Sequence, residues 1–204
     1  MKLYSFTTPT FNVTKPLLTA EELELDFTLV KLDPRAAEHK AGEHVARHPL
    51  GKVPALEHGD RVLFESMAIT RYLLSLKPHT FDGDDAATSD QWSEFMILHP
   101  GRAIGVLFWE EIIRGKMNGL APDAKAVAKA TTQLADELGL VEERLDGRPW
   151  ISGQAFGVAD IVAASYLWSL EGLSFSLAEL PRLKDWYARV TGRPAFARLR
   201  AHYA

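Results

Sequence analysis

The chain has 204 residues, a formal net charge of −4 and no cysteine. Hydrophobic residues make up 47% and charged residues 25%, which is typical of a folded globular protein and excludes a largely disordered one. The mildly acidic charge argues against a nucleic-acid partner, and without cysteine any thiol chemistry must use a thiol that a ligand brings.

The first third of the chain alternates between strand-like and helix-like segments. Lys2–Phe6 reads as a strand, and residues 7–12 form a polar loop. Apolar residues near helical spacing predict a helix over residues 13–25, with Pro16 in its first turn, where proline is tolerated. Residues 26–32 read as a second strand. This β-α-β order predicts a parallel pair of strands.

A β-hairpin and a further helix follow. Residues 34–48 are mixed in character, with some helix potential. Residues 53–57 and Arg61–Phe64 read as short strands joined by a tight turn that contains glycine. Residues 66–76 read as a helix, and we expect Ser66 to be its N-cap residue.

Beyond residue 80 the sequence predicts helices only. Residues 89–116 read as a long helix that Pro100 should kink. Further helices are expected over residues 123–145, 158–171 and 181–191, with a short one from Pro194. The composition thus predicts an α/β domain over residues 1–78, a linker over residues 79–87 with three aspartates and one glycine, and an all-α domain over residues 88–204.

The chain carries no sequence signal for export or for a membrane. Its start does not resemble a signal peptide, and no apolar run reaches the length of a membrane span. We therefore expect a cytoplasmic protein without a membrane partner.

Three short motifs point to a known family. They are E-H-K over residues 38–40, H-P-L-G-K-V-P-A-L over residues 48–56 and E-S-M-A-I over residues 65–69. Together they resemble the cytosolic glutathione transferases, in particular phi-class and related bacterial enzymes. The resemblance is strong over residues 1–75 and weaker in the helical half. It implies a thioredoxin-like N-terminal domain that binds glutathione and a C-terminal helical bundle.

The resemblance also implies which residues hold glutathione. In the family the bond that corresponds to Val53-Pro54 is cis, so that the Val53 backbone can pair with the cysteinyl part of glutathione in strand fashion. Glu65 and Ser66 would hold the γ-glutamyl end, where a helix N-terminus offers free N–H groups to a carboxylate. The glycyl carboxylate would be held by three basic residues, namely His39, Lys40 and Lys52.

The catalytic task is to lower the pKa of the glutathione thiol, because only the thiolate is nucleophilic. Thr10 falls where phi- and theta-class enzymes carry their catalytic serine. The spacing of Thr10 and Asn12 also resembles the T-P-N pattern of nu-class bacterial enzymes, in which both side chains contact the sulfur. We therefore predict Thr10 as the hydroxyl donor and Asn12 as a second donor, with Thr8 as the alternative. Either Thr10 or Asn12 could equally serve as a helix cap.

The second substrate is expected to be a hydrophobic electrophile bound between the two domains. Candidate contacts are Phe11, His99, Arg102 and Phe108, although helical spacing cannot place all of them on one face. No metal site is expected. Asp160, which follows Gly157 at a predicted helix start, resembles the buried aspartate of a folding motif in the family, so we interpret it as structural.

Three functions remain open at the level of the sequence. The first is conjugation of glutathione to an electrophile. The second is glutathione-dependent reduction of peroxides or disulfides. The nu-like pair of threonine and asparagine slightly favours this chemistry. The third is glutathione binding without catalysis, since a fold does not fix a function. The resemblance further implies a homodimer, in which Leu50 occupies the place of an aromatic anchor residue.

Overall fold

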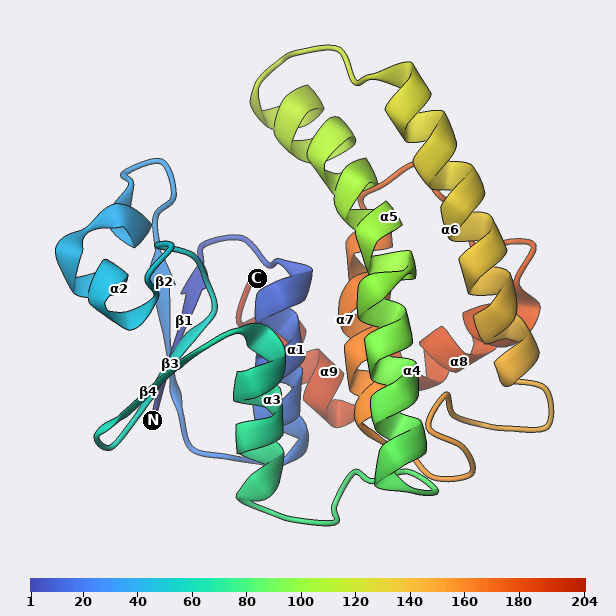
Figure 1. The fold of residues 1–204 in the computed structure, drawn as a ribbon, viewed down its shortest axis with the longest axis horizontal. Coiled ribbons are helices and arrows are strands. Elements are labelled where there is room, and N and C mark those ends of the chain that lie inside the picture. The colour runs from blue at the N-terminus through green and yellow to red at the C-terminus, as the bar shows by residue number, and fades with distance from the viewer. The chain divides into compact units, whose positions relative to one another are not determined.

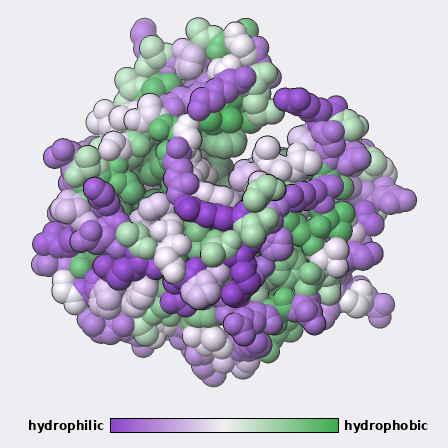
Figure 2. All heavy atoms as spheres, turned by 180° about the vertical axis from the view of Figure 1, so that it is seen from behind, coloured by the Kyte–Doolittle hydropathy of each residue, from purple (hydrophilic) through white to green (hydrophobic).

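The computed structural model describes residues 1–204. The chain forms two compact units, one of Met1–Thr80 together with Gly192–Ala204 and one of Phe81–Thr191 (Figure 1). None of the helices combines the length and the apolar character that crossing a membrane requires. Figure 2 shows hydrophilic residues spread over the face seen from behind, with hydrophobic residues in patches among them.

The first unit is built on a four-stranded mixed sheet. Its strands are β1 (Lys2–Phe6), β2 (Thr28–Leu32), β3 (Ala55–His58) and β4 (Arg61–Phe64), in the spatial order β2-β1-β3-β4. Its helices are α1 (Phe11–Glu22), η1 (Glu38–Lys40), α2 (Gly42–Arg47), α3 (Ser66–Ser75) and α9 (Pro194–Ala201). In Figure 1 α1 and α3 lie on one side of the sheet and α2 on the other. β1 pairs with β2 in parallel and with β3 antiparallel, which confirms the predicted thioredoxin-like arrangement.

The core of this unit lies between the sheet and α1. Leu3, Leu17 and Leu56 are fully buried there. Helix α9, which comes from the end of the chain, packs against α1. Two arginines join it to the last turn of α1: Arg193 Nε lies 2.6 Å from a Glu22 carboxylate oxygen and Arg198 Nε lies 2.7 Å from one of Glu21.

Two boundaries of α1 differ from the prediction. Thr10 caps the helix, so α1 begins at Phe11 and Pro16 lies in its second turn instead of its first. Proline there has no N–H to donate to the Asn12 carbonyl four residues earlier. The helix also ends three residues earlier than predicted, because Glu24 adopts a left-handed backbone conformation with φ 51°.

Strand β3 begins later than predicted, and helix α3 has a different N-cap residue. The strand begins at Ala55 instead of Val53, since Pro54 cannot donate a hydrogen bond to a neighbouring strand. The prediction of Ser66 as the N-cap of α3 is wrong. Glu65 occupies that position with φ 69° and ψ 118°, and Ser66 is the first helical residue.

The second unit contains helices only, as predicted. They are α4 (Ala86–Leu98), α5 (Pro100–Leu107), the π-helix η2 (Phe108–Met117), α6 (Ala124–Arg144), α7 (Val158–Leu170) and α8 (Pro181–Thr191). The predicted kink is a full break at His99, directly before Pro100. The π-helical turns of η2 were not predicted, since no residue type marks them.

The buried carboxylate of Asp160 joins three segments of the second unit. One of its oxygens accepts hydrogen bonds from Ile151 N at 2.8 Å and Trp186 Nε1 at 2.7 Å. The other accepts from Gly157 N at 3.0 Å and Ser152 N at 3.3 Å. Burial raises the pKa of Asp160, and the hydrogen bonds from these donors oppose that rise. The residue is therefore structural, as the sequence indicated.

Glycine at the N-cap of α7 has a steric cause. A Cβ atom at Gly157 would lie 2.5 Å from Ser152 Oγ and 2.9 Å from the backbone nitrogen of Gly83. The space that a serine or threonine cap would fill is thus already occupied. Asp160 instead accepts the hydrogen bond from the Gly157 N–H itself.

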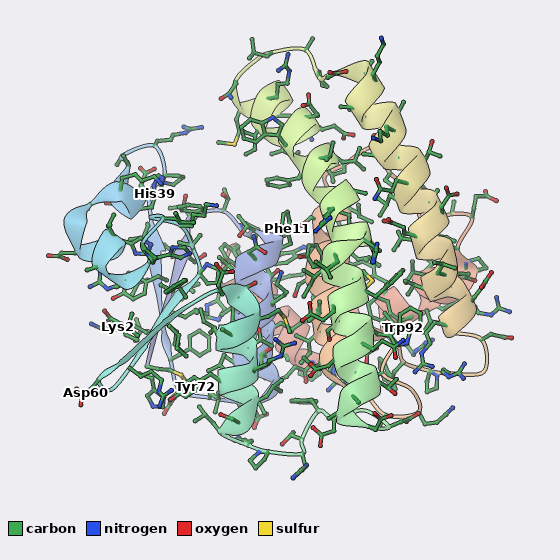
Figure 3. The ribbon with its side chains drawn as sticks, in the orientation of Figure 1. Lys2, Phe11, His39, Asp60, Tyr72 and Trp92 are labelled. Carbon is green, nitrogen blue, oxygen red and sulfur yellow. The ribbon has the colours of Figure 1, made fainter.

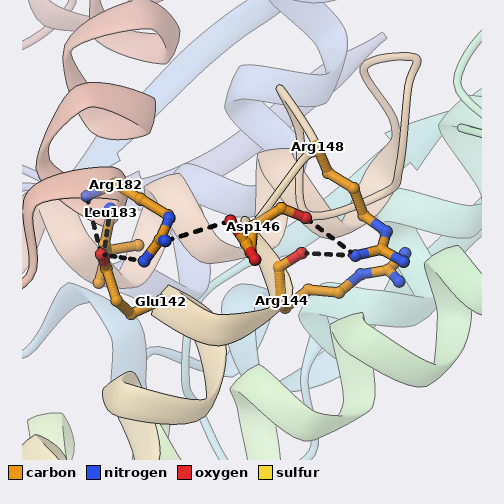
Figure 4. Close-up of polar contacts among 6 residues, drawn as sticks. All are labelled: Glu142, Arg144, Asp146, Arg148, Arg182 and Leu183. Carbon is orange, nitrogen blue, oxygen red and sulfur yellow. Dashed lines mark hydrogen bonds and ion pairs between the residues drawn. The ribbon is translucent and has the colours of Figure 1, made fainter.

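The start of α8 is capped from α6, as Figure 4 shows. Glu142 accepts hydrogen bonds from the backbone nitrogens of Arg182 at 3.0 Å and Leu183 at 2.8 Å. The Arg182 side chain in turn lies 3.4 Å from Glu142 and 3.1 Å from Asp146. A carboxylate at a helix N-terminus satisfies free N–H groups and interacts favourably with the helix dipole.

Candidate functional site

Three segments leave the sheet of the first unit at the same end. Tyr4 near the end of β1 pairs with Ala55 at the start of β3, and Ala55 pairs with Phe64 at the end of β4. The β1–α1 loop, the Val53-Pro54 pair and the start of α3 therefore emerge together. The register thus gathers most of the predicted glutathione residues at one end of the sheet, although they lie far apart in the sequence.

Thr10 has a free hydroxyl hydrogen at this end of the sheet. Its backbone is extended, with φ −132° and ψ 146°, and its Oγ1 accepts a hydrogen bond of 3.4 Å from Val13 N. A hydroxyl that accepts one hydrogen bond still has its own hydrogen to donate. The cap role and the predicted catalytic role are thus compatible. Thr8 is an exposed residue of the preceding loop.

Asn12 contacts a buried lysine that the sequence did not single out. Lys15 Nζ donates to Asn12 Oδ1 at 3.0 Å, and the ammonium group lies 5.9 Å from the ring centre of Phe11. Lys15 is 1% exposed. Burial lowers its pKa to about 7, although the charge of Glu65 acts in the opposite direction. The one signal in the sequence was a single charged residue within an otherwise uncharged stretch of the helix.

The start of α3 presents polar groups without partners. Glu65 is exposed and makes no side-chain hydrogen bond to the helix it caps. Its positive φ is rare for a residue other than glycine and costs about 1–3 kcal/mol. The hydroxyl of Ser66 has no hydrogen-bond partner within the chain, and the first N–H groups of a helix lack internal acceptors. Strain beside unpaired donors is typical of a ligand site.

The Val53-Pro54 bond is cis, as the resemblance implies. Neither the N–H nor the C=O of Val53 makes a hydrogen bond within the chain. Ala55, two residues further on, is paired on both sides, with Tyr4 and Phe64. Val53 thus offers one unpaired donor and one unpaired acceptor directly beside a strand, which is the pattern that an extended peptide ligand needs.

The predicted basic residues lie around the turn that precedes Val53. Lys40 donates from Nζ to the carbonyl oxygens of Leu50 at 2.8 Å and Gly51 at 3.1 Å. Gly51 has φ 55°, and a Cβ atom there would lie 2.6 Å from the carbonyl oxygen of His39. Lys52 is exposed, and its own carbonyl accepts from a nitrogen of the buried His44.

His39 is the middle residue of η1 (Figure 3). Its ring packs edge-on against Phe6, with the ring centres 5.3 Å apart, and its buried Nδ1 has no hydrogen-bond partner. Burial and, to a smaller extent, the charges of Lys40 and His44 lower the pKa of His39. The residue is therefore biased towards its neutral form, so Lys40 and Lys52 carry the positive charge of this corner.

The predicted second-substrate residues belong to different units. Phe11 is the first residue of α1, beside Thr10 (Figure 3). His99 lies at the break between α4 and α5, where its ring packs on Phe95 at 5.0 Å. The other two candidates lie on α5 and at the start of η2: Arg102, which is exposed, and Phe108, which is half-buried.

A cavity of about 400 Å³ lies elsewhere, in the second unit near the start of α8. Its lining combines Leu145 and Pro149 with charged side chains that include Arg148 and Asp185. None of the predicted site residues lines it, so it is distinct from the candidate site. No group of three His, Cys, Asp or Glu residues is placed to hold a metal ion.

Comparison with known proteins agrees with this geometry. The sequence model of the glutathione S-transferase N-terminal domain matches residues 1–75, and that of the C-terminal domain matches residues 95–194. A probable glutathione S-transferase of rice, Oryza sativa subsp. japonica, is 32% identical over 200 residues, which cover 93% of this chain and 91% of the relative.

Two solved structures share the whole fold. A glutathione S-transferase-I bound with lactoylglutathione is 30% identical with a TM-score of 0.90, and the match covers 98% of each chain. A maize glutathione S-transferase I in complex with an atrazine–glutathione conjugate is 29% identical with a TM-score of 0.88, covering 99% of this chain and 97% of the other. The family models and the relatives span both units, and the chain belongs to the glutathione S-transferase family.

Proposed function

We propose that this chain activates the thiol of glutathione with the Thr10 hydroxyl and transfers the glutathionyl group to a hydrophobic electrophile. As a member of the family, the chain is an enzyme with glutathione as its co-substrate. The observation that carries the proposal is the free hydroxyl hydrogen of Thr10 at the end of the sheet where Val53 and Glu65 also emerge.

The unpaired groups of the site match the three parts of glutathione. The Val53 N–H and C=O would pair with the cysteinyl backbone. The Ser66 hydroxyl and the first N–H groups of α3 would hold the γ-glutamyl carboxylate, while Glu65 faces the ammonium group. Lys52 is free to meet the glycyl carboxylate, and Lys40 and His39 would support it from the same corner.

The chemical step needs the glutathione thiolate at neutral pH. A free thiol has a pKa of about 8.5, so about 3% of it is ionised at pH 7. Lowering that pKa by about two units requires about 2.7 kcal/mol of preferential stabilisation of the thiolate. A hydrogen bond from Thr10 and another from Asn12, at the N-terminus of α1, are sufficient for this. Thr8 lies before the cap and is the alternative donor.

The transfer itself conserves charge and atoms. The sulfur lone pair of the thiolate forms a bond to the electrophilic carbon, and the leaving group departs with its bonding electrons. Phe11 lies next to Thr10 and is proposed to supply an apolar contact for the electrophile. Contacts of His99, Arg102 and Phe108 with that substrate stay predictions from the sequence.

Reduction of peroxides or disulfides by the same thiolate is the second candidate. The observation that favours it is the pairing of Thr10 with Asn12, both at the start of α1, which resembles the nu-class pattern. The finer placement near phi-, theta- and nu-class bacterial enzymes is part of the proposal: it rests on the motifs of residues 38–69, on Thr10 at the position of the phi- and theta-class serine, and on this nu-like pair. A glutathione-binding protein without catalysis is the third candidate, and it predicts binding with no activation of the thiol.

Thr10→Ala tests the proposed function. The variant should bind glutathione with a dissociation constant close to that of the wild type, because the groups that hold the ends of the tripeptide are intact. Its kcat/KM for conjugation of chlorodinitrobenzene at pH 7 should fall roughly 10-fold or more, because a thiol pKa that returns towards about 8.5 leaves only about 3% of the bound thiol ionised. The control is Thr8→Ala, which should keep wild-type activity. An active Thr10→Ala enzyme would contradict the assignment.

We also infer a cytoplasmic homodimer. Leu50 is 61% exposed at the turn after α2, and Val45 on α2 and Phe64 at the end of β4 are exposed as well. Large apolar side chains exposed in one domain are consistent with a protein contact surface when they form a patch. Light scattering should give the mass of a dimer for the wild type, and Leu50→Glu should shift the equilibrium to the monomer. A monomeric wild type would contradict this inference.

A further inference from the structure

Lys15 occupies a position that stability alone does not explain. Its side chain is fully buried, which costs free energy because the charged ammonium group is taken out of water. It also lies in the N-terminal half of α1, where the helix dipole disfavours a positive charge. A methionine would fill the same space without either cost, so the ammonium group itself is the feature to explain.

The contact with Asn12 fixes the orientation of the Asn12 amide. In its ammonium form Lys15 only donates hydrogen bonds, so the amide atom that faces Nζ at 3.0 Å is then the oxygen Oδ1. The other amide atom, Nδ2, then points away from Lys15. In the flipped orientation two donors would face each other. Asn12 is exposed, so the outward-facing Nδ2 is available to a ligand.

The backbone around Asn12 makes this side-chain contact more important. Residues three apart on a helix are neighbours on one face, which places Lys15 directly beneath Asn12. Pro16 lacks the N–H that would otherwise bond the Asn12 carbonyl. The first turn of α1 therefore has one helical hydrogen bond fewer at the Asn12 carbonyl, and the contact of Lys15 Nζ with Asn12 Oδ1 is the one that holds the Asn12 side chain.

We propose that Lys15 is a positioning residue for thiol activation: its ammonium group holds Asn12 Oδ1 and so directs Asn12 Nδ2 towards the sulfur of bound glutathione. This inference rests on the proposed function, in which Asn12 is the second donor to the thiolate. Glu65 lies close enough for its charge to favour the charged form of Lys15. Glu65 at the start of α3 and Lys15 in α1 therefore interact electrostatically.

The test is a double-mutant cycle read out as the pKa of the bound glutathione thiol, followed by thiolate absorbance. The variants are Lys15→Met, Asn12→Ala and the double variant. Asn12→Ala should raise the thiol pKa by about one unit, as expected for the loss of one hydrogen bond to the charged form. Lys15→Met should give a similar rise, and the double variant should rise no further than Asn12→Ala alone.

Two controls separate positioning from a general structural effect. Lys15→Arg keeps a hydrogen-bond donor at this position, so the pKa of the bound thiol should stay close to its low wild-type value. Lys129→Met, which removes an exposed lysine from α6, should leave the pKa of the bound thiol unchanged. Thermal unfolding of each variant confirms that it is folded, and Lys15→Met should fold because it retains the buried chain without the charge.

The outcomes distinguish this inference from the proposed function. If Asn12→Ala leaves the thiol pKa at the wild-type value, Asn12 is not a donor and that part of the proposed function fails. If Asn12→Ala raises the thiol pKa but Lys15→Met does not, only the positioning role fails. Effects of the two single variants that add in the double variant would likewise overturn it, since independent contributions need no contact.

Discussion

Replacing Asp160 with alanine is expected to remove about 4 kcal/mol or more from the free energy of unfolding. The change leaves four buried N–H groups, those of Ile151, Ser152, Gly157 and Trp186, without an acceptor. Each unsatisfied buried donor costs about 1–3 kcal/mol. Relaxation and entry of water offset part of that sum. Since whole domains are stable by about 5–15 kcal/mol, much of the variant should fail to fold.

Urea unfolding at pH 7 measures this effect, and two variants serve as comparison. Asp160→Asn keeps one acceptor oxygen but adds two donors to a site of four donors, so it should also lose stability, though less than alanine does. Asp185→Ala removes an exposed carboxylate from α8 and should change stability by no more than about 0.5 kcal/mol. A loss below about 1 kcal/mol in Asp160→Ala would mean that the buried network is not needed for folding.

Replacing Lys15 with methionine is expected to stabilise the protein at neutral pH. The pKa of Lys15 is lowered from 10.5 to about 7 in the folded state. Between these values the unfolded chain binds more protons than the folded one, so stability rises with pH across this window. Below pH 7 Lys15 is charged in both states, so the full free-energy cost of burying its charge acts on the folded protein. A shift of this size corresponds to a cost of about 5 kcal/mol at low pH.

The measurement is urea unfolding of the wild type and Lys15→Met at several values between pH 7 and pH 9. Wild-type stability should rise by about 2 kcal/mol relative to the variant over this range, because only the wild type releases the proton. The comparison stays below pH 10. At higher pH the tyrosines of the unfolded chain ionise, whereas the buried Tyr166, whose pKa is raised to about 12, does not, and this difference also changes the free energy of unfolding. If the difference between the two proteins did not change with pH, Lys15 would not have a lowered pKa.

The two effects of Lys15 oppose each other. The methionine variant should be more stable and, by the positioning argument, should activate the thiol less. Ionisable groups that are costly to bury and that adjoin a ligand site are often retained for function. A more stable and equally active variant would leave the burial of this lysine without a functional reason.

Much of the fold was predictable because its signals are local. The strands Lys2–Phe6 and Arg61–Phe64 match the prediction residue for residue, since short apolar runs between turn residues mark strands well. Helix α8 matches at both ends, because Pro181 marks its start. The break before Pro100 follows from proline chemistry alone.

Other features depend on contacts that no local pattern records. Glu65 rather than Ser66 caps α3 because its backbone adopts a positive φ, which residue preferences do not favour. Burial of Lys15 was missed because the segment from Val13 to Glu21 is buried on every face, so helical periodicity does not separate a core side from a solvent side. That α9 joins the first unit follows from pairs such as Arg193 with Glu22, far apart in sequence.

For the site, the sequence suggested which residues are involved, and the fold shows where they come together. The register of β1, β3 and β4 places Thr10, Val53 and Glu65 at one end of the sheet, and that register follows from hydrophobic alternation and the hairpin. The roles of these residues towards glutathione are proposals that rest on their unpaired donors and acceptors.

The central claim is that Thr10 lowers the pKa of the glutathione thiol. The most direct measurement is an ultraviolet titration of the thiolate in the complex of glutathione with the wild type and with Thr10→Ala. The account predicts a bound thiol pKa about two units below the value of about 8.5 for a free thiol, with a return towards that value in Thr10→Ala. A bound thiol with an unshifted pKa in the wild type would contradict it and leave a glutathione-binding protein without thiol activation.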